Sequence, residues 1–240
     1  MLQEETKMVW VKICGLTNVE DAVTAAALGA DALGAVLVEA SPRFVTAERA
    51  RGMFSEVRGE LLGRGLKMPA FVVVTVAERP EDVLKLEAEL KGTGVMCVQL
   101  HGEEPPSLVR ALKKQGLKLR IIKKVGVGGA NADADELIRS AAAYDAAGAD
   151  AILLDTQAET LGGSGRAHDW RLSRAVTFAL QGRAKVILAG GLNPENVEAA
   201  VKTVRPFGVD VSSGVELRKG KKDSEKVKRF IERAKSVRVE

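Results

Sequence analysis

The sequence has 240 residues and a formal charge of +4, from 36 Lys and Arg against 32 Asp and Glu. With 46% hydrophobic and 28% charged residues, its composition is that of a globular protein with a sizeable core, which excludes a mainly disordered chain. The first ten residues, MLQEETKMVW, lack the features of a secretory signal, and no apolar run reaches the roughly 18 residues of a membrane span. We therefore expect a cytoplasmic protein.

Short apolar segments alternate with longer amphipathic segments along the whole chain. The short segments are aliphatic and end in loops rich in Gly, Ser, Thr or Pro, which is typical of buried strands, and the longer ones have helical spacing. In chain order, the expected strands are Val9–Cys14, Ala32–Val38, Ala70–Val76, Val95–Leu100, Leu119–Val125, Ala151–Asp155, Lys185–Ala189 and Val209–Ser212. The expected helices are Val19–Leu28, Ala47–Val57, Pro80–Lys91, Pro106–Gln115, Ala134–Ala147, Asp169–Leu180, Pro194–Thr203 and Ser224–Ser236.

Residues at the expected helix ends support these boundaries. Asn18 and Asn193 can cap helices, and Pro194 occupies a favoured first helical position. Glycines stand where helices should end, at Gly29, Gly116 and Gly148.

Buried strands joined by helices require a parallel sheet that is covered on both faces. Eight such units close most naturally into a (β/α)8 barrel, here a single α/β domain over residues 1–240, with a short N-terminal extension over residues 1–8. An open doubly wound sheet is the alternative, but GxGxxG does not follow the first strand.

Polar and reactive residues gather at the expected carboxyl ends of the strands, where barrel enzymes carry their chemistry. Because alternate residues of a strand point inward, Lys12 shares an inward face with Cys14, and Asp210 shares one with Ser212. A Lys and an Asp inside a barrel need partners, so we expect Lys12 and Asp210 to pair beneath the site. The residues at the strand ends are Cys14, Ser41-Pro42-Arg43, Gln99, His101, Asp155, Gly190-Gly191 and Ser212-Ser213-Gly214.

The positive charge is concentrated near the C-terminus. Ten basic and four acidic residues lie between Arg218 and Glu240. Apolar residues recur there at helical spacing, which favours the solvated face of an amphipathic helix over a nucleic-acid patch. We expect no nucleic-acid or membrane partner. With two Cys and two His, the chain offers neither a disulfide framework nor a zinc site.

Between about residues 9 and 235, the sequence closely resembles the phosphoribosylanthranilate isomerase family of tryptophan biosynthesis. Several separated segments agree in order, which is far more specific than any one of them. The segments are KICGLT at 12–17, SPRFV at 41–45, VQLHG at 98–102, LLDT at 153–156, GGSG at 162–165, HDW at 168–170, LAGGLNPENV at 188–197 and GVDVSSGVE at 208–216.

The resemblance implies an Amadori rearrangement of an aminoaldose phosphate to a 1-deoxyribulose phosphate. It assigns Asp155 as the acid that protonates the ring oxygen and Cys14 as the base that removes the C2′ proton. A carboxyl is a poor acid at neutral pH, and a thiol a poor base, unless their surroundings tune them in opposite directions. We expect Lys12 to favour the thiolate of Cys14, and a closed loop over residues 160–166 to keep Asp155 dry.

The remaining residues have expected binding roles. The fork of Arg43 suits the anthranilate carboxylate, and Gln99 and His101 should line the pocket, although His101 as the acid–base group stays an alternative. Cys97 is expected to be a buried structural residue, and His168 to cap or orient the sixth helix. We expect the phosphate to be bound by small residues of the loops after the seventh and eighth strands. They are Gly190, Gly191, Ser212, Ser213 and Gly214.

The partner expected from this chemistry is a small phosphosugar. No metal or organic cofactor is expected, because the proton transfers take place within the substrate. The protein should work as a monomer or a homodimer, and the sequence favours neither. Two other functions stay open: a different phosphosugar isomerase or epimerase of the same fold, and a non-catalytic barrel that binds a phosphate ligand.

Overall fold

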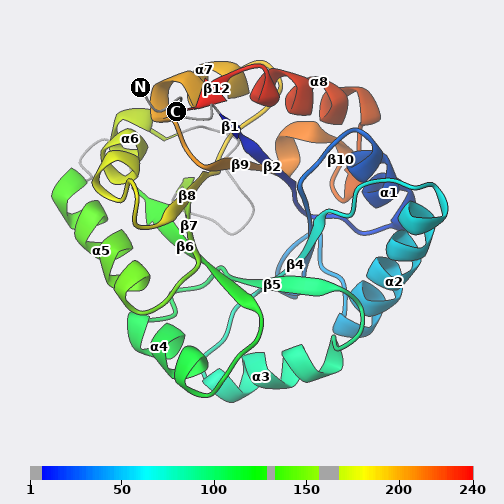
Figure 1. Cartoon of the computed structure of the whole chain (residues 1–240), viewed down its shortest axis with the longest axis horizontal. Helices are drawn as coiled ribbons and strands as arrows, with labels where there is room; N and C mark the ends of the chain where they lie inside the picture. Colours follow the sequence, from blue (N-terminus) through cyan, green and yellow to red (C-terminus); the bar gives the residue numbers. More distant parts are fainter. Residues whose placement is uncertain (1–6, 129–132, 157–167, 240) are drawn as a thin grey trace, which may run out of the picture.

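The computed structural model describes residues 7–128, 133–156 and 168–239. Eight parallel strands form a closed barrel in which each strand pairs with the next along the chain and β9 closes onto β2 (Figure 1). The barrel strands are β2 (Trp10–Ile13), β3 (Ala32–Val36), β4 (Ala70–Thr75), β5 (Val95–Leu100), β6 (Arg120–Val127), β7 (Ala151–Thr156), β8 (Lys185–Leu188) and β9 (Gly208–Val211). The expected (β/α)8 barrel is confirmed.

A ring of helices surrounds the barrel (Figure 1). The apolar stripe of each helix packs against the outer face of the strands, and this helix–strand layer is the larger part of the core. The helices are α1 (Val19–Ala27), α2 (Ala47–Gly63), α3 (Pro80–Glu89), α4 (Pro106–Lys114), α5 (Ala134–Ala146), α6 (Trp170–Ala179), α7 (Val197–Val204) and α8 (Ser224–Lys235).

A second, smaller core fills the interior of the barrel. Its members are inward-facing residues of alternate strand positions, and Cys97 is among them, as expected for a structural cysteine. Burial raises the pKa of its thiol. The cluster is Ala32, Val72, Cys97, Ile122, Ala151, Leu153, Ile187 and Ala189. It fills the barrel below the polar end, so the chemistry is confined to the mouth.

The helix ends mostly follow the expected residues. Asn18 caps α1 by accepting a hydrogen bond from the Asp21 amide at 2.9 Å. The glycines at three helix ends have positive φ, at 96° for Gly29, 85° for Gly116 and 101° for Gly148.

Two helices differ from their expected bounds by more than two residues. Helix α2 continues from the expected end at Val57 to Gly63. Helix α7 begins at Val197 rather than Pro194, because the Asn193 side chain caps a separate turn by accepting from the amides of Glu195 and Asn196.

The structure has short elements that the sequence did not predict. Two of them pair the ends of the described chain, and three others lie in the loop after β9. Strand β1 (Lys7–Met8) pairs antiparallel with β12 (Arg238–Val239), which ties the two ends of the described chain together. After β9, a 3-10 turn η1 (Ser213–Val215) leads into the hairpin of β10 (Glu216–Arg218) and β11 (Lys221–Lys222). None of the described helices is long and apolar enough to cross a membrane.

Candidate active site

The expected site residues come together at one end of the barrel. Gly15, with φ of 72°, lies so close to its neighbours that an added Cβ would stand 2.5 Å from Arg43 Cδ and 2.6 Å from Ser212 Oγ. A Cβ on Gly190 would overlap Thr156 and stand 2.9 Å from Asp155 Oδ1. The loops after β2, β3 and β9 therefore meet at Gly15, and the loop after β8 meets the end of β7.

Cys14 is a buried free thiol directly after β2. Its sulfur fills the space that Gly34 leaves open, because a Cβ there would stand 2.8 Å from Cys14 Sγ. Burial raises the pKa of the Cys14 thiol, and the nearby Lys12 ammonium lowers it by less. Lys12 thus favours the thiolate, as expected, but desolvation outweighs its attraction, so the pKa of Cys14 is raised rather than lowered.

Lys12 lies fully buried inside the barrel, next to Cys14. Its Nζ donates to Asp210 Oδ1 at 3.0 Å, as the sequence predicted, because β2 and β9 pair with these two residues in register. The same ammonium donates to Gln99 Oε1 at 2.9 Å. Burial lowers the pKa of Lys12, but Asp210 and Cys14 outweigh that effect, and the pKa is raised. Lys12 is therefore a cation.

Gln99 and His101 extend this contact across the barrel mouth. Gln99 Nε2 lies 2.9 Å from His101 Nδ1, and His101 Nε2 lies 3.4 Å from Asp155 Oδ2. Gln99 is 1% exposed, whereas the side chains of His101 and Asp155 are 33% and 27% exposed. A line of polar groups thus runs from Lys12, which lies beside Cys14, through Gln99 and His101 to Asp155.

Arg43 is buried and held by a carboxylate that the sequence analysis did not single out. Its Nε and Nη2 donate to the two oxygens of Glu216 at 2.6 and 2.7 Å. Lys222 Nζ donates to Glu216 Oε1 at 3.2 Å and to the Ser212 carbonyl at 3.1 Å. Arg43 Nη1 has no hydrogen bond to any described residue. Arg43 and Lys222 therefore share the Glu216 carboxylate, and burial lowers the pKa of Lys222.

Lys222 and Glu216 show where sequence reasoning failed. Lys222 belongs to the basic C-terminal stretch, whose charges we assigned mostly to a solvated helix face. That assignment holds for α8, which buries Val227, Phe230 and Ile231. Lys222, however, is 5% exposed because the β10–β11 hairpin returns to the barrel mouth. The only signal was the position of Glu216 directly after the VSSGV segment.

The two glycine-rich loops expected to bind phosphate lie against each other. A Cβ on Gly214 would overlap the Leu192 carbonyl oxygen, so the loops after β8 and β9 are in contact. Gly190 and Gly191 have φ of 81° and 67°, and their amides donate to no described residue. The buried Ser212 Oγ also lacks a partner among the described residues. Unsatisfied donors at a strand-end loop are suited to an anion.

His168 orients α6, as the sequence predicted, while Asp169 provides the cap. His168 Nδ1 lies 3.1 Å from Thr156 Oγ1, and its Nε2 lies 2.5 Å from Ser173 Oγ in α6. Asp169 accepts from the Arg171 amide at 2.9 Å. The expected closing loop over residues 160–166, with its GGSG segment, lies outside the described residues.

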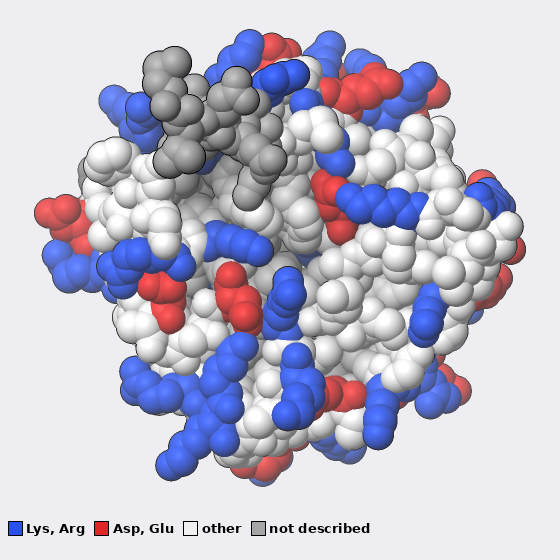
Figure 2. Space-filling model, in the orientation of Figure 1, with Lys and Arg blue, Asp and Glu red and all other residues white. Residues whose placement is uncertain are grey.

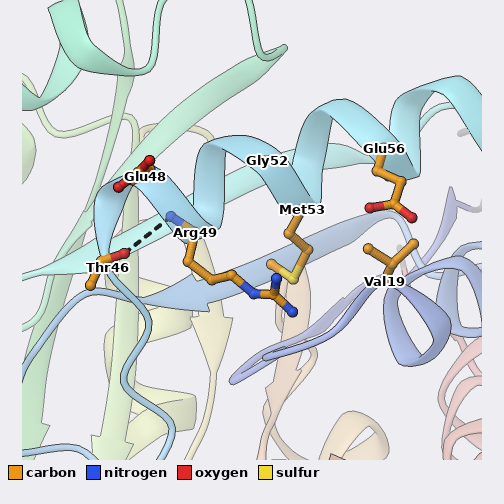
Figure 3. Close-up of a pocket in the computed structure, with 7 residues that line it drawn as sticks. All are labelled: Val19, Thr46, Glu48, Arg49, Gly52, Met53 and Glu56. Carbon is orange, nitrogen blue, oxygen red and sulfur yellow. Dashed lines mark hydrogen bonds between the residues drawn. The ribbon is translucent and has the colours of Figure 1, made fainter.

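A separate groove lies at the outer rim, between the beginnings of α1 and α2 (Figure 3). It is lined by Val19, Thr46, Glu48, Arg49, Gly52, Met53 and Glu56, and the Thr46 hydroxyl caps α2. None of the expected site residues lines it. Within the described ranges, no three His, Cys, Asp or Glu side chains form a metal-binding group.

Comparison with known proteins identifies the family of this chain. The family described as N-(5'-phosphoribosyl)anthranilate (PRA) isomerase matches residues 11–233. The N-(5'-phosphoribosyl)anthranilate isomerase of Methanocella arvoryzae is 41% identical over 229 residues, which cover 95% of this chain and 99% of that protein.

Solved structures agree with the sequence comparison. Phosphoribosyl anthranilate isomerase from Thermotoga maritima has a TM-score of 0.78 at 40% identity, covering 96% of this chain and 100% of that chain. A phosphoribosyl anthranilate isomerase in complex with reduced 1-(o-carboxyphenylamino)-1-deoxyribulose 5-phosphate has a TM-score of 0.74 at 38% identity, with the same coverage of 96% and 100%.

Proposed function

The chain belongs to the N-(5'-phosphoribosyl)anthranilate isomerase family, and we propose that Cys14 and Asp155 carry the two proton transfers of its reaction. The enzyme isomerises phosphoribosylanthranilate in tryptophan biosynthesis by an Amadori rearrangement. One group must protonate the ring oxygen, and another must remove the proton from C2′. The observation that supports this pair is their placement at one barrel mouth, joined by the polar line through Lys12, Gln99 and His101.

In the first step, Asp155 gives its proton to the ring oxygen. The bond between that oxygen and C1′ breaks, and the nitrogen lone pair forms the Schiff base. Asp155 is placed for this step at the barrel mouth, with Oδ2 towards His101 and Oδ1 beside the loop at Gly190. It ends the step as a carboxylate.

In the second step, the Cys14 thiolate takes the C2′ proton. The electrons of that C–H bond form a C1′–C2′ double bond, and the imine electrons return to nitrogen, which gives the enolamine. Tautomerisation then moves the hydroxyl proton from O2′ to C1′ and produces the ketone, and proton exchange with solvent returns Cys14 to the thiolate and Asp155 to the acid. Because burial raises the pKa of Cys14, only a small fraction of the thiol is ionised, but that thiolate is a strong base. The Lys12 ammonium lies beside it.

We assign substrate binding to Arg43 and to the two glycine loops at the mouth. Arg43 offers Nη1 to the anthranilate carboxylate while Glu216 holds the rest of its fork. The amides at Gly190 and Gly191, with Ser212, Ser213 and Gly214 of the facing loop, bind the phosphate. Gln99 and His101 line the pocket between these sites.

The direct test is the decay of phosphoribosylanthranilate fluorescence after purified protein is added. We expect decay, with formation of the 1-deoxyribulose product. A different phosphosugar isomerase or epimerase would leave the fluorescence unchanged but convert another phosphosugar. A non-catalytic binder would bind a product analogue without any decay.

We further propose that the enzyme acts in the cytoplasm, without a cofactor and with a small phosphosugar as its partner. The free thiols of Cys14 and Cys97 suit a reducing compartment. A Thermotoga maritima relative is described as dimeric, so light scattering should distinguish a monomer from a homodimer here. Activity should stay in the soluble fraction and survive EDTA. Activity lost to EDTA and restored by a divalent ion would contradict the cofactor-free reaction.

A further inference from the structure

We propose that Lys12 and Gln99 are positioning residues that fix the tautomer of His101, so that neutral His101 presents an Nε2–H group to Asp155. The proposal deepens the proposed function, because Asp155 is its acid. It follows from the donors and acceptors along the line of contacts from Lys12 to Asp155.

Lys12 determines which atoms donate and which accept along the line of contacts from Lys12 to Asp155. An ammonium group can only donate hydrogen bonds, and the Lys12 ammonium is fully buried between Asp210 and Gln99. The Gln99 atom 2.9 Å from Lys12 Nζ must therefore be its carbonyl oxygen, Oε1. A flipped amide would place NH2 against NH3+ in a buried space, which costs an unpaired buried donor.

The orientation of Gln99 then decides the protonation of His101. With Oε1 on Lys12, the amide NH2 faces His101 Nδ1 at 2.9 Å. An NH2 group donates, so Nδ1 must accept with its lone pair. The proton of the neutral imidazole is consequently on Nε2, which faces Asp155 Oδ2 at 3.4 Å. Every donor along the line thus points from Lys12 towards Asp155.

This arrangement has a chemical consequence for Asp155. If Nε2 were unprotonated, its lone pair could take up the acidic proton of Asp155, and that proton would be lost to the substrate. With Nε2 protonated, His101 turns an N–H group towards Oδ2, 3.4 Å away, and takes no proton from the acid. The lone pair of Nδ1 is then occupied by Gln99 and Nε2 carries the proton, which argues against His101 as the base.

The test is the side-chain nitrogen NMR spectrum of ¹⁵N-labelled protein, which reports the protonation of each imidazole nitrogen. The chain has only two His, so His168→Gln assigns the signals. At a pH where His101 is neutral, we expect a protonated Nε2 and an unprotonated Nδ1. A wild-type spectrum with Nδ1 protonated would overturn the proposal, whatever the activity shows.

The matched variant is Gln99→Glu, which keeps the acceptor for Lys12 but replaces the NH2 donor with a second acceptor. We expect Nδ1 of His101 to become protonated, with kcat reduced roughly tenfold and KM little changed. Gln99→Leu should give a mixture of tautomers. His168 hydrogen-bonds elsewhere, so its unchanged signals confirm that each variant is folded.

An unchanged His101 spectrum in folded Gln99→Glu would contradict the role of Gln99. The outcome is separable from the proposed function, because the tautomer is measured in the free protein. A wild-type tautomer as expected, together with normal turnover by Asp155→Asn, would refute the acid assignment and leave the tautomer inference standing.

Discussion

At the scale of single residues, the burial of Cys14 determines how the enzyme should respond to pH. The base acts only as thiolate, and a raised pKa means that the thiolate fraction at neutral pH is smaller than for an ordinary thiol, whose pKa is about 8.5. Because Cys14 must be a thiolate while Asp155 is still protonated, we expect a bell-shaped profile of kcat/KM against pH. A profile that has only one limb would contradict the assignment of both a base and an acid, and Cys14→Ser should remove the limb that belongs to Cys14.

Arg43 allows a second test at this scale. Arg43→Ala removes the Nη1 donor and the partner of Glu216, so we expect KM for phosphoribosylanthranilate to rise about 10–100-fold, with lower turnover as well. Arg43→Lys keeps the charge but loses the fork, and should recover only part of the affinity. Steady-state kinetics measure both. An unchanged KM in Arg43→Ala would place the carboxylate elsewhere.

Residues whose role follows from their position on a barrel strand could be predicted from the sequence. Residues that reach the site through a hairpin folded back over the barrel mouth could not. Lys12 and Asp210 were predicted to pair because both side chains point into the barrel. They lie on strands β2 and β9, which close the barrel side by side. Lys222 was missed because a Lys among many charged residues has no signal for burial. The pKa direction of Cys14 was missed for a related reason, since desolvation depends on the neighbours that fold over the thiol.

At the scale of elements, a buried ion pair fixes the loop between β5 and α4, which begins with His101. Glu104 accepts from the amides of Ala77 and Gly102 through Oε1, and its Oε2 lies 2.7 Å from Lys123 Nζ. Both side chains are 1% exposed. The pair anchors the loop to β6 and to the end of β4.

Replacing one member of this pair should destabilise the protein strongly. Glu104→Gln leaves the Lys123 ammonium buried without a counter-ion, so we expect a loss of about 3–5 kcal/mol in the free energy of unfolding. Glu103→Gln is the matched control, because Glu103 pairs with Lys124 from a side chain that is 92% exposed, and should cost about 0–1 kcal/mol. Urea denaturation measures both variants. Equal effects would mean that the buried pair does not anchor the loop.

Strands and helices of about six residues or more were predicted well, and two-residue strands were not. Strand β5 has the expected bounds, because a run of six residues between turn signals is recognisable. The two-residue strands β1, β11 and β12 are too short to show any alternation. Helix α7 begins late because the Asn193 side chain caps a separate turn, and the sequence does not show that this turn ends before the helix begins.

At the scale of the whole molecule, positive charge forms no strip on the face shown in Figure 2. Figure 2 shows Lys and Arg side chains spread around the visible face, with Asp and Glu beside many of them. We expect no sequence-selective complex with DNA or RNA at physiological salt. Fluorescence anisotropy with labelled oligonucleotides checks this, and a selective complex that survives that salt concentration would show that our interpretation of the charge is wrong.

The central claim is that Cys14 and Asp155 are the base and the acid, and one set of variants tests it most directly. Steady-state kinetics of Cys14→Ser and Asp155→Asn should show kcat lowered by about 10²–10⁴ or more, while affinity for the reduced product analogue stays close to that of the wild type. Cys97→Ser, a change of the other buried thiol, should affect stability more than kcat. Near-normal kcat in Cys14→Ser would mean that another group is the base and would contradict the mechanism.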